Sequence, residues 1–223
     1  MTREEVIGDC RLILGDCRDI LPTLGPVDAV VTDPPYGIGI TRSNRLAVSR
    51  GMGGGSWDDE TPEASLIAQI VGMATEAILW GGNYFDLPPT RCFLVWDKVN
   101  DGRDFADIEF AWTNIDAVAR IHRQRPMNMD GGKVHPTQKP ISLMMWCLGL
   151  MPDARTVLDP FTGSGSTGVA CALTDRSFIG IEREPSYFDI ACRRIEEAYR
   201  QPRLFAEPIA KPIQSTISFE DAT

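Results

Sequence analysis

Two short segments carry residues whose types and spacing point to chemistry, and the first is TDPPYG at residues 32–37. Its two prolines, Pro34 and Pro35, fix the backbone φ and remove two N–H donors, which leaves a rigid row of carbonyl groups. The amine of a nucleobase is a poor nucleophile because its lone pair is delocalised into the ring, and acceptors that hold its hydrogens improve it. We expect Asp33 and the Pro34 carbonyl to be those acceptors, and Tyr36 to stack on a base taken out of a duplex. A bare Asp-Pro-Pro is more often a tight turn, so this interpretation depends on a second motif.

The second motif is TVLDPFTGSGSTG at residues 156–168, which predicts a strand running into a glycine-rich turn and then an apolar helix. Glycines at 163, 165 and 168 let the backbone approach a ligand closely and also satisfy GxGxxG, the dinucleotide-binding fingerprint. Such a fingerprint normally opens a cofactor domain, yet little more than one further βα unit follows it here. The glycines alone leave both cofactors open, but this position in the chain favours S-adenosylmethionine over a dinucleotide.

Two acids near the second motif point the same way. We expect Asp159 to hold a cationic amino group, which suits the methionine end of S-adenosylmethionine better than a pyrophosphate. Glu182 ends the next predicted strand and is expected to accept hydrogen bonds from ribose hydroxyls under either cofactor. Taken singly, Asp159 also fits a helix N-cap and Glu182 a solvated strand end.

The elements that must position these residues follow the pattern of a mostly parallel sheet flanked by helices. Short apolar runs predict strands at residues 11–14, 29–32, 77–80, 92–96, 156–158 and 178–182. Helical spacing predicts helices over 61–73, with Thr61 as N-cap and Pro62 in the first turn, over 140–151 and over 185–200. Residues 105–111 and 115–121 are predicted to form a hairpin turning at Thr113 and Asn114.

Composition limits the class of protein. At 223 residues the chain can bury one substantial core, and we expect one catalytic domain over residues 1–201 and an extended or disordered tail over 202–223. The net charge of −9 does not by itself indicate a nucleic-acid partner. Six cysteines without paired spacing and two histidines outside any ligand pattern predict reduced thiols and no metal. With no apolar run near about 18 residues, a cytoplasmic protein is expected.

The two motifs in this order resemble the amino-group DNA methyltransferases, specifically the permuted β arrangement in which DPPY precedes the FxGxG cofactor loop. The resemblance covers roughly residues 10–200. It implies a Rossmann-like S-adenosylmethionine-dependent methyltransferase fold, α/β, with a mostly parallel sheet, an antiparallel edge hairpin and helices on both faces. It also implies direct in-line methyl transfer without a covalent intermediate or metal, so that no cysteine is catalytic.

The resemblance also assigns residues to the cofactor. Asp16 and Cys17, in a Gly-Asp-Cys turn, are expected to contact its adenine, and Lys139 of the HPTQKP segment to pair with its methionine carboxylate, although an exposed lysine is the ordinary alternative. Together with the acids above, the expected cofactor-binding set is Asp16, Cys17, Asp33, Lys139, Asp159, Pro160, Phe161, Thr162, Gly163, Ser164, Gly165, Thr167 and Glu182.

DNA contacts are expected from two short basic stretches, at residues 38–56 and 120–133, because little sequence remains for a separate recognition region. We predict relaxed specificity or recognition through a second subunit, and a homodimer is one such arrangement. The expected DNA-binding residues, each of which also fits an ordinary solvated side chain, are Arg42, Arg45, Arg50, Arg123, Arg125, Lys133 and His135.

Competing functions remain at this point. Family resemblance ties DPPY more often to N6 of adenine and SPPY to N4 of cytosine, so adenine is preferred and cytosine is the first alternative. Methylation of an amino group on RNA or protein, a noncatalytic partner subunit and an NAD-dependent oxidoreductase follow in that order.

Overall fold

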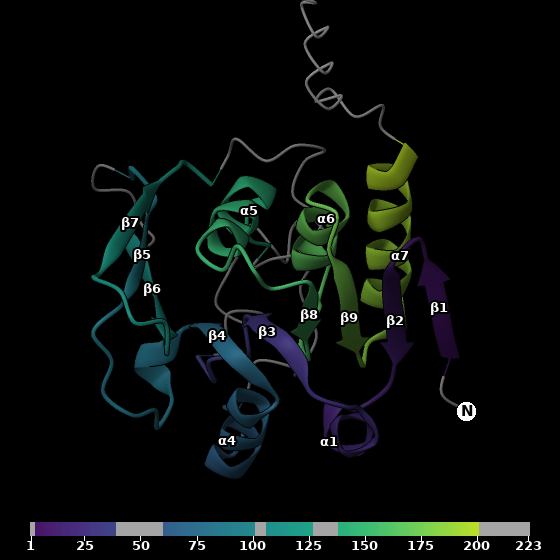
Figure 1. The fold of residues 1–223 in the computed structure, drawn as a ribbon, viewed down its shortest axis with the longest axis horizontal. Helices are drawn as coiled ribbons and strands as arrows, with labels where there is room; N and C mark the ends of the chain where they lie inside the picture. The colour runs from purple at the N-terminus through teal and green to yellow at the C-terminus, as the bar shows by residue number, and fades with distance from the viewer. Residues whose placement is uncertain (1–2, 39–59, 101–105, 127–137, 201–223) are drawn as a thin grey trace, which may run out of the picture.

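The computed structural model describes residues 3–38, 60–100, 106–126 and 138–200, which are coloured in Figure 1. These residues form one nine-stranded sheet in the order β1-β2-β9-β8-β3-β4-β6-β5-β7. The strands are β1 (Arg3–Ile7), β2 (Cys10–Leu14), β3 (Val27–Thr32), β4 (Ala74–Trp80), β5 (Leu94–Asp97), β6 (Ile108–Thr113), β7 (Arg120–Arg123), β8 (Thr156–Asp159) and β9 (Ser177–Glu182). The helices are α1 (Cys17–Ile20), α4 (Ala64–Gly72), α5 (Ile141–Gly149), α6 (Ser166–Leu173) and α7 (Pro185–Arg200), with 3-10 turns η1 (Leu21–Thr23) and η2 (Gly82–Tyr84).

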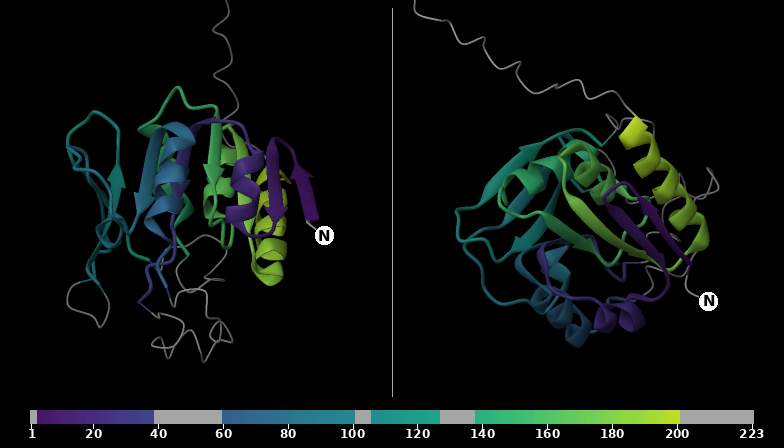
Figure 2. Two further views of the ribbon diagram at one scale, coloured as in Figure 1. Left: turned by 90° about the horizontal axis from the view of Figure 1, so that it is seen from below. Right: turned by 45° about the vertical axis from the view of Figure 1, so that its right-hand side comes forward.

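Helices cover both faces of the sheet. Figure 1 places α5, α6 and α7 on one face and α1 and α4 on the other, and the right-hand view of Figure 2 shows α7 and the α1–α4 pair on opposite sides. The buried apolar side chains accordingly fall into two clusters. One joins the sheet to α5, α6 and α7, around Leu143 and Phe188. The other joins it to α1 and α4, around Ile20 and Ile67. This arrangement and the largely parallel centre of the sheet confirm the predicted α/β fold class.

The centre of the sheet aligns the two motifs. Strand β3 pairs in parallel with β8 on one side and with β4 on the other. Val30, for example, lies between Leu158 and Ala77. Because parallel strands end at the same edge, the segment after β3 and the glycine-rich turn after β8 emerge side by side, which is where open α/β sheets bind ligands.

Two of the predicted elements were wrong in detail. Helix α4 begins at Ala64 with Glu63 as its N-cap, so neither Thr61 nor Pro62 starts it. Within the predicted hairpin, the described residues 106–121 do not pair with one another: β6 pairs with β4 and β5, and β7 pairs in parallel with the far side of β5. The reason lies at Asn114, whose carboxamide bonds the Ala77 N–H and the Thr75 carbonyl and so continues the pairing toward β4.

The antiparallel edge hairpin lies instead at the other end of the sheet. Strand β1, which was not predicted, pairs with β2 through a register that ends at Ile7 and Cys10. Its sequence REEVI has only two apolar residues and most of its side chains are exposed, so no alternating pattern marks it. The division into a catalytic domain and a tail stays a prediction, because residues 201–223 lie outside the described part.

No helix within the described ranges is long and apolar enough to cross a membrane.

Candidate active site

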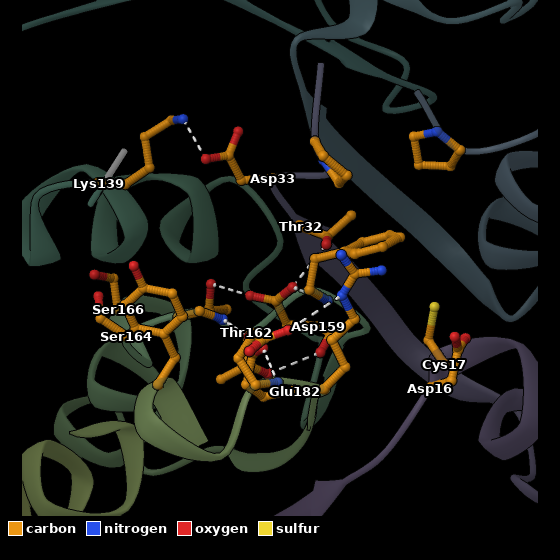
Figure 3. A pocket seen from close by; sticks show the side chains of 18 of the residues that line it. Asp16, Cys17, Thr32, Asp33, Lys139, Asp159, Thr162, Ser164, Ser166 and Glu182 are labelled. Carbon is orange, nitrogen blue, oxygen red and sulfur yellow. Dashed lines mark hydrogen bonds and ion pairs between the residues drawn. The ribbon is translucent and has the colours of Figure 1, made fainter. Parts of the chain in front are cut away.

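A cavity of ≈ 560 Å³ opens at the carboxyl ends of β3 and β8 (Figure 3). Its walls come from the start of α1, the end of β3, residues 60–66, the turn between β8 and α6, and the segment from Glu182 to Tyr187. In Figure 3, Asp16 and Cys17 lie on the side of the pocket away from Lys139 and Asp33, with Asp159 and Glu182 between them. The cavity therefore joins both motifs in one elongated site.

Asp159 ties the two motifs together. It is 3% exposed, and its carboxylate accepts hydrogen bonds from Thr32 Oγ1 at 2.6 Å, the Phe161 N–H at 3.1 Å and Thr167 Oγ1 at 2.8 Å. These bonds link the last residue of β3 to the start of α6. Burial raises the pKa of Asp159 to about 6. Asp159 is not a helix N-cap, since Gly165 holds that position in α6.

The glycine-rich turn is fixed by contacts with β9 and α7. Gly165 has φ +82, and a Cβ there would lie 2.9 Å from Ala191 Cβ, so only glycine fits this close approach to α7. Arg194 of α7 donates from Nη1 to the Ser164 carbonyl at 2.5 Å and lies 3.0 Å from Ser164 Oγ. Because the turn is held by its neighbours, it can present backbone N–H groups to a ligand without reorganising.

Glu182, the last residue of β9, contacts the glycine-rich turn. Its two carboxylate oxygens accept from the Gly163 N–H and the Glu184 N–H, both at 2.8 Å. Burial raises the pKa of Glu182 to about 7. Each oxygen keeps a further lone pair, so the carboxylate can still accept hydrogen bonds from a ligand.

At the far end of the cavity, Asp16 is the N-cap of α1 and accepts from the Arg18 N–H at 2.9 Å. Hydrogen bonds from Arg18 lower the pKa of Asp16, so it is a carboxylate. Cys17 is buried, and burial raises the pKa of its thiol to about 11. A neutral thiol and an anion thus form the floor of this end.

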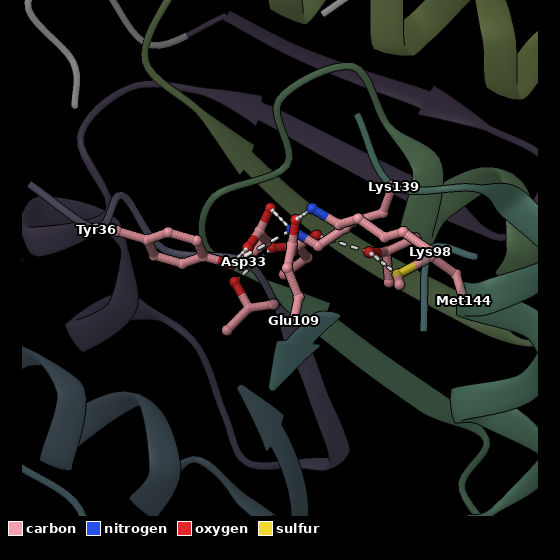
Figure 4. Close-up of polar contacts among 9 residues, drawn as sticks. Asp33, Tyr36, Lys98, Glu109, Lys139 and Met144 are labelled. Carbon is pink, nitrogen blue, oxygen red and sulfur yellow. Dashed lines mark hydrogen bonds and ion pairs between the residues drawn. The ribbon is translucent and has the colours of Figure 1, made fainter. Parts of the chain in front are cut away.

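Asp33 belongs to a cluster of four charges in which both lysines are buried and both carboxylates are partly buried (Figure 4). Its Oδ2 lies 2.5 Å from Lys139 Nζ, and its Oδ1 accepts from the Tyr36 hydroxyl. Lys139 Nζ also lies 3.0 Å from Glu109 Oε2, while Glu109 Oε1 lies 2.6 Å from Lys98 Nζ. Lys139 is only 5% exposed, so the alternative of an exposed lysine is wrong.

The Tyr36 ring lies in an aromatic group. It stacks on Tyr84 with centroids 4.9 Å apart and planes 14° apart, and meets Phe85 edge-on at 6.3 Å. A Cβ on Gly81 would come within 2.0 Å of the Tyr36 ring, so the glycine makes room for it. Burial, followed by the charges of Asp33 and Glu109, raises the pKa of the Tyr36 phenol, which therefore donates to Asp33 as a neutral hydroxyl.

The structure brings most of the predicted site residues together. Of the expected cofactor-binding residues, all except Pro160 and Gly165 line the cavity. Asp33 and Pro35 of the predicted catalytic residues also line it, whereas Pro34 is buried and Tyr36 contacts the lining residue Asp33 through its hydroxyl. The roles assigned to these residues stay predictions.

The predicted DNA-binding residues are divided. Arg123 and Arg125 are exposed on and after β7, and Arg123 Nε lies 3.1 Å from Asp97 Oδ2. The remaining predicted positions lie outside the described residues; they are Arg42, Arg45, Arg50, Lys133 and His135.

Several residues of the site were missed. Lys98 follows β5, Glu109 lies in β6 and Tyr84 lies in η2, all distant in sequence from both motifs. One signal was available: Glu109 alternates with Ala111 and Thr113, which are fully buried, and a charge on the buried face of a strand requires a partner. Within the described part of the chain, no group of three or more histidine, cysteine or acidic side chains is arranged to hold a metal ion.

Comparisons with known proteins bear on this geometry. Residues 94–193 match the model of the DNA methylase family N6_N4_Mtase. The Type II methyltransferase M2.MboI of Moraxella bovis is 31% identical over 143 residues, covering 64% of this chain and 48% of that protein. M2.DpnII of Streptococcus pneumoniae is 32% identical over 145 residues, covering 63% and 49%. The chain thus spans about half the length of these curated relatives.

Solved structures share the fold. The complex of M1.HpyAVI with S-adenosylmethionine superposes with a TM-score of 0.57 at 22% identity, over 83% of this chain and 98% of that one. The PvuII DNA methyltransferase, described as cytosine-N4-specific, gives a TM-score of 0.57 at 14% identity, over 87% and 93%. Sequence and structure matches together confirm the resemblance to the amino-group DNA methyltransferases and their Rossmann-like α/β fold.

Proposed function

We propose that this chain transfers a methyl group from S-adenosylmethionine to N6 of an adenine in DNA. The observation that carries the proposal is the position of Asp33. Its carboxylate lines the same cavity as the glycine-rich turn and Glu182, so an acceptor for a base amine and a nucleoside cofactor site share one space. Curated relatives named Type II methyltransferases and the DNA methylase family match support DNA as the substrate.

The residues present fit the cofactor. The cavity volume falls within the range of about 300–1,000 Å³ that small-molecule sites occupy. Asp16 and Cys17 would hold the adenine, Glu182 the ribose hydroxyls, and Asp159 the amino group, since its Oδ2 accepts only from Thr167 among the described residues. Bound S-adenosylmethionine supplies an electrophilic methyl group on a sulfonium ion.

The part played by the TDPPYG segment is to prepare the nucleophile. Asp33 and the Pro34 carbonyl would accept the two hydrogens of the base amine, which returns electron density to its nitrogen. The Tyr36 ring would position the base, held in its own place by Tyr84 and by its hydroxyl bond to Asp33. Lys139 currently pairs with Asp33, so its expected bond to the methionine carboxylate would require a partner exchange.

Finer features of the function are proposals of the same kind. DNA contacts would come from the basic residues of 38–56 and 120–133, and the protein would act in the cytoplasm, as a monomer or a homodimer. N4 of cytosine is the second candidate substrate, because its conjugated amine presents the same two hydrogens to Asp33 and the Pro34 carbonyl. The DPPY tetrad, by its resemblance, favours adenine.

The test is methylation of unmethylated DNA with labelled S-adenosylmethionine, followed by digestion to nucleosides. We expect N6-methyladenine, and a loss on the order of 10²–10⁴-fold for Asp33→Ala. Asp116→Ala is the matched control, because this acid is exposed on the surface and should leave activity unchanged.

Other outcomes discriminate between candidates. N4-methylcytosine alone would replace adenine by cytosine, and methylation only of RNA or protein would remove DNA from the proposal. Full activity in Asp33→Ala would contradict the assigned chemistry, and binding of NAD in place of S-adenosylmethionine would overturn the cofactor.

A further inference from the structure

The acceptor that the proposed reaction requires is already occupied. Asp33 Oδ1 accepts from the Tyr36 hydroxyl, and Asp33 Oδ2 pairs with Lys139 Nζ at 2.5 Å. A carboxylate neutralised by an ammonium group draws weakly on the hydrogens of a neutral amine. For Asp33 to act on a base, Lys139 must therefore loosen its hold.

Lys139 cannot simply leave. Its side chain is 5% exposed, and it lies beneath the Tyr36 and Trp80 rings, 5.6 and 5.7 Å from their centroids. A buried ammonium group without a counter-ion costs several kcal/mol. A second anion must be within reach of Nζ.

Glu109 supplies that anion. Its Oε2 is buried and 3.0 Å from Lys139 Nζ, yet no donor in the described residues meets hydrogen-bond geometry with it. The hydrogen bonds of Lys139 Nζ go instead to Asp33 Oδ2 and, at 3.3 Å, to the Tyr36 hydroxyl. A small change in the side-chain torsions of Lys139 would bring Nζ into hydrogen-bond geometry with Glu109 Oε2 without moving the backbone.

Lys98 holds the Glu109 carboxylate in place. Its Nζ lies 2.6 Å from Glu109 Oε1, and Lys98 is itself buried at 8% exposure. Although burial acts to raise it, the ammonium groups of Lys139 and Lys98 hold the pKa of Glu109 at about 2, whereas burial raises the pKa of Asp33. Of the two carboxylates, Glu109 therefore has the stronger preference for the ionised form. The cluster contains two carboxylates and two ammonium groups, so moving Lys139 between the carboxylates leaves no net buried charge.

From this geometry, and resting on the proposed function, we infer that Glu109 is a positioning residue that receives the Lys139 ammonium when the amine of the target base takes the Asp33 carboxylate. Glu109 touches neither base nor cofactor in this role. It makes the acceptor available at the moment the base enters.

The test is the single-turnover rate of DNA methylation by Glu109→Gln, compared in the wild-type and Lys139→Met backgrounds. In the wild-type background the substitution leaves Asp33 as the only carboxylate of the described residues that pairs with Lys139, and we expect a loss of about 10-fold or more. In the Lys139→Met background there is no Lys139 ammonium to be transferred to Glu109. The same substitution should then lower the single-turnover rate by less than about 2-fold. The affinity of the Glu109→Gln variant for S-adenosylmethionine, measured by calorimetry, should stay within about 2-fold of the wild type.

A purely structural role for Glu109 predicts another pattern. Equal losses in both backgrounds, or no loss in either, would overturn the inference. Glu196→Gln is the matched control, since this exposed glutamate pairs with Arg200 on α7 and should not change the rate. If Lys139→Met is inactive, Glu109→Asp decides: it keeps the anion, and a rate no higher than that of Glu109→Gln also overturns the inference.

The two proposals fail separately. A wild-type protein that methylates no DNA removes the proposed function and this inference with it. An active wild type with additive losses removes only the role of Glu109.

Discussion

Two parts of the site are held together by different forces. We call Asp159–Thr167 with Glu182 the cofactor side, and Asp33, Tyr36, Lys98, Glu109 and Lys139 the target side. On the cofactor side, carboxylates accept from hydroxyl and backbone N–H groups, and each donor belongs to a fixed element. On the target side, ion pairs dominate, and Lys139 lies between two carboxylates.

The difference corresponds to what each side must do. A cofactor that returns to the same pose in every cycle is served by preorganised hydrogen bonds, which cost no rearrangement when the ligand binds. A base amine must instead replace a partner already present on Asp33. An ion-pair cluster with a second carboxylate beside Lys139 allows such an exchange, because the Lys139 ammonium stays paired while the base amine takes its place on Asp33.

The largest effect that separates the two sides is expected for Asp159→Ala. The change leaves the Thr32 and Thr167 hydroxyls and the Phe161 N–H without their buried acceptor, which should lower the free energy of unfolding by about 2–4 kcal/mol and weaken cofactor binding. Urea unfolding and calorimetry measure both quantities. Asp159→Asn keeps an acceptor and should be milder.

Asp33→Ala should affect a different quantity from Asp159→Ala. That change should reduce the rate of methyl transfer but leave S-adenosylmethionine affinity within about 2-fold, because the cofactor side keeps all its hydrogen bonds. If both substitutions weakened cofactor binding equally, the division of the cavity into two sides would be wrong.

A pH effect on cofactor affinity is expected next in size. The pKa of Glu182 is about 7 in the free protein, so near neutral pH much of it is protonated. Ribose hydroxyls that donate to the carboxylate favour its ionised form, and binding should therefore release a proton and lower that pKa. Affinity should rise by up to about 10-fold as pH increases through about 7 and then level off.

The measurement is calorimetry across that pH range in buffers with different enthalpies of ionisation, which counts the protons released. Glu182→Gln should remove the dependence near pH 7, since an amide does not titrate. A pH dependence that survives this substitution would assign the proton to another group and leave the ribose without its predicted acceptor.

The sequence predicted the cofactor side better than the target side. The cofactor side is nearly contiguous, and a strand, a glycine-rich turn and a helix follow one another in residues 156–173, so local pattern located it. The target side brings Asp33 to Lys139, 106 residues apart, and adds Glu109 from β6. Its ion pairs depend on sheet register and on packing before α5, which no local pattern encodes.

The wrong hairpin has the same origin. Thr113 and Asn114 resemble turn residues in sequence, but Thr113 is fully buried in β6 and the Asn114 side chain bonds β4. The predicted turn paired residues 105–111 with 115–121, so β6 was not expected to pair with β5. The prediction therefore did not place Glu109 opposite Trp96, its partner in the β5–β6 register. An error about one side chain thus concealed half of the charged cluster.

The smallest effect that can sharpen the comparison is expected at Tyr84, on the target side. The residue is 46% exposed, and the stacking of its ring on Tyr36 should contribute about 1 kcal/mol. Tyr84→Leu removes this support, so the Tyr36 ring would sample more orientations and the KM for DNA should rise about 5-fold, with kcat and cofactor affinity nearly unchanged. Tyr84→Phe keeps the stacked ring and is the matched control. Equal effects of the two substitutions would mean that the hydroxyl, not the ring, acts here, and a weakened cofactor affinity would extend the target side into the cofactor site.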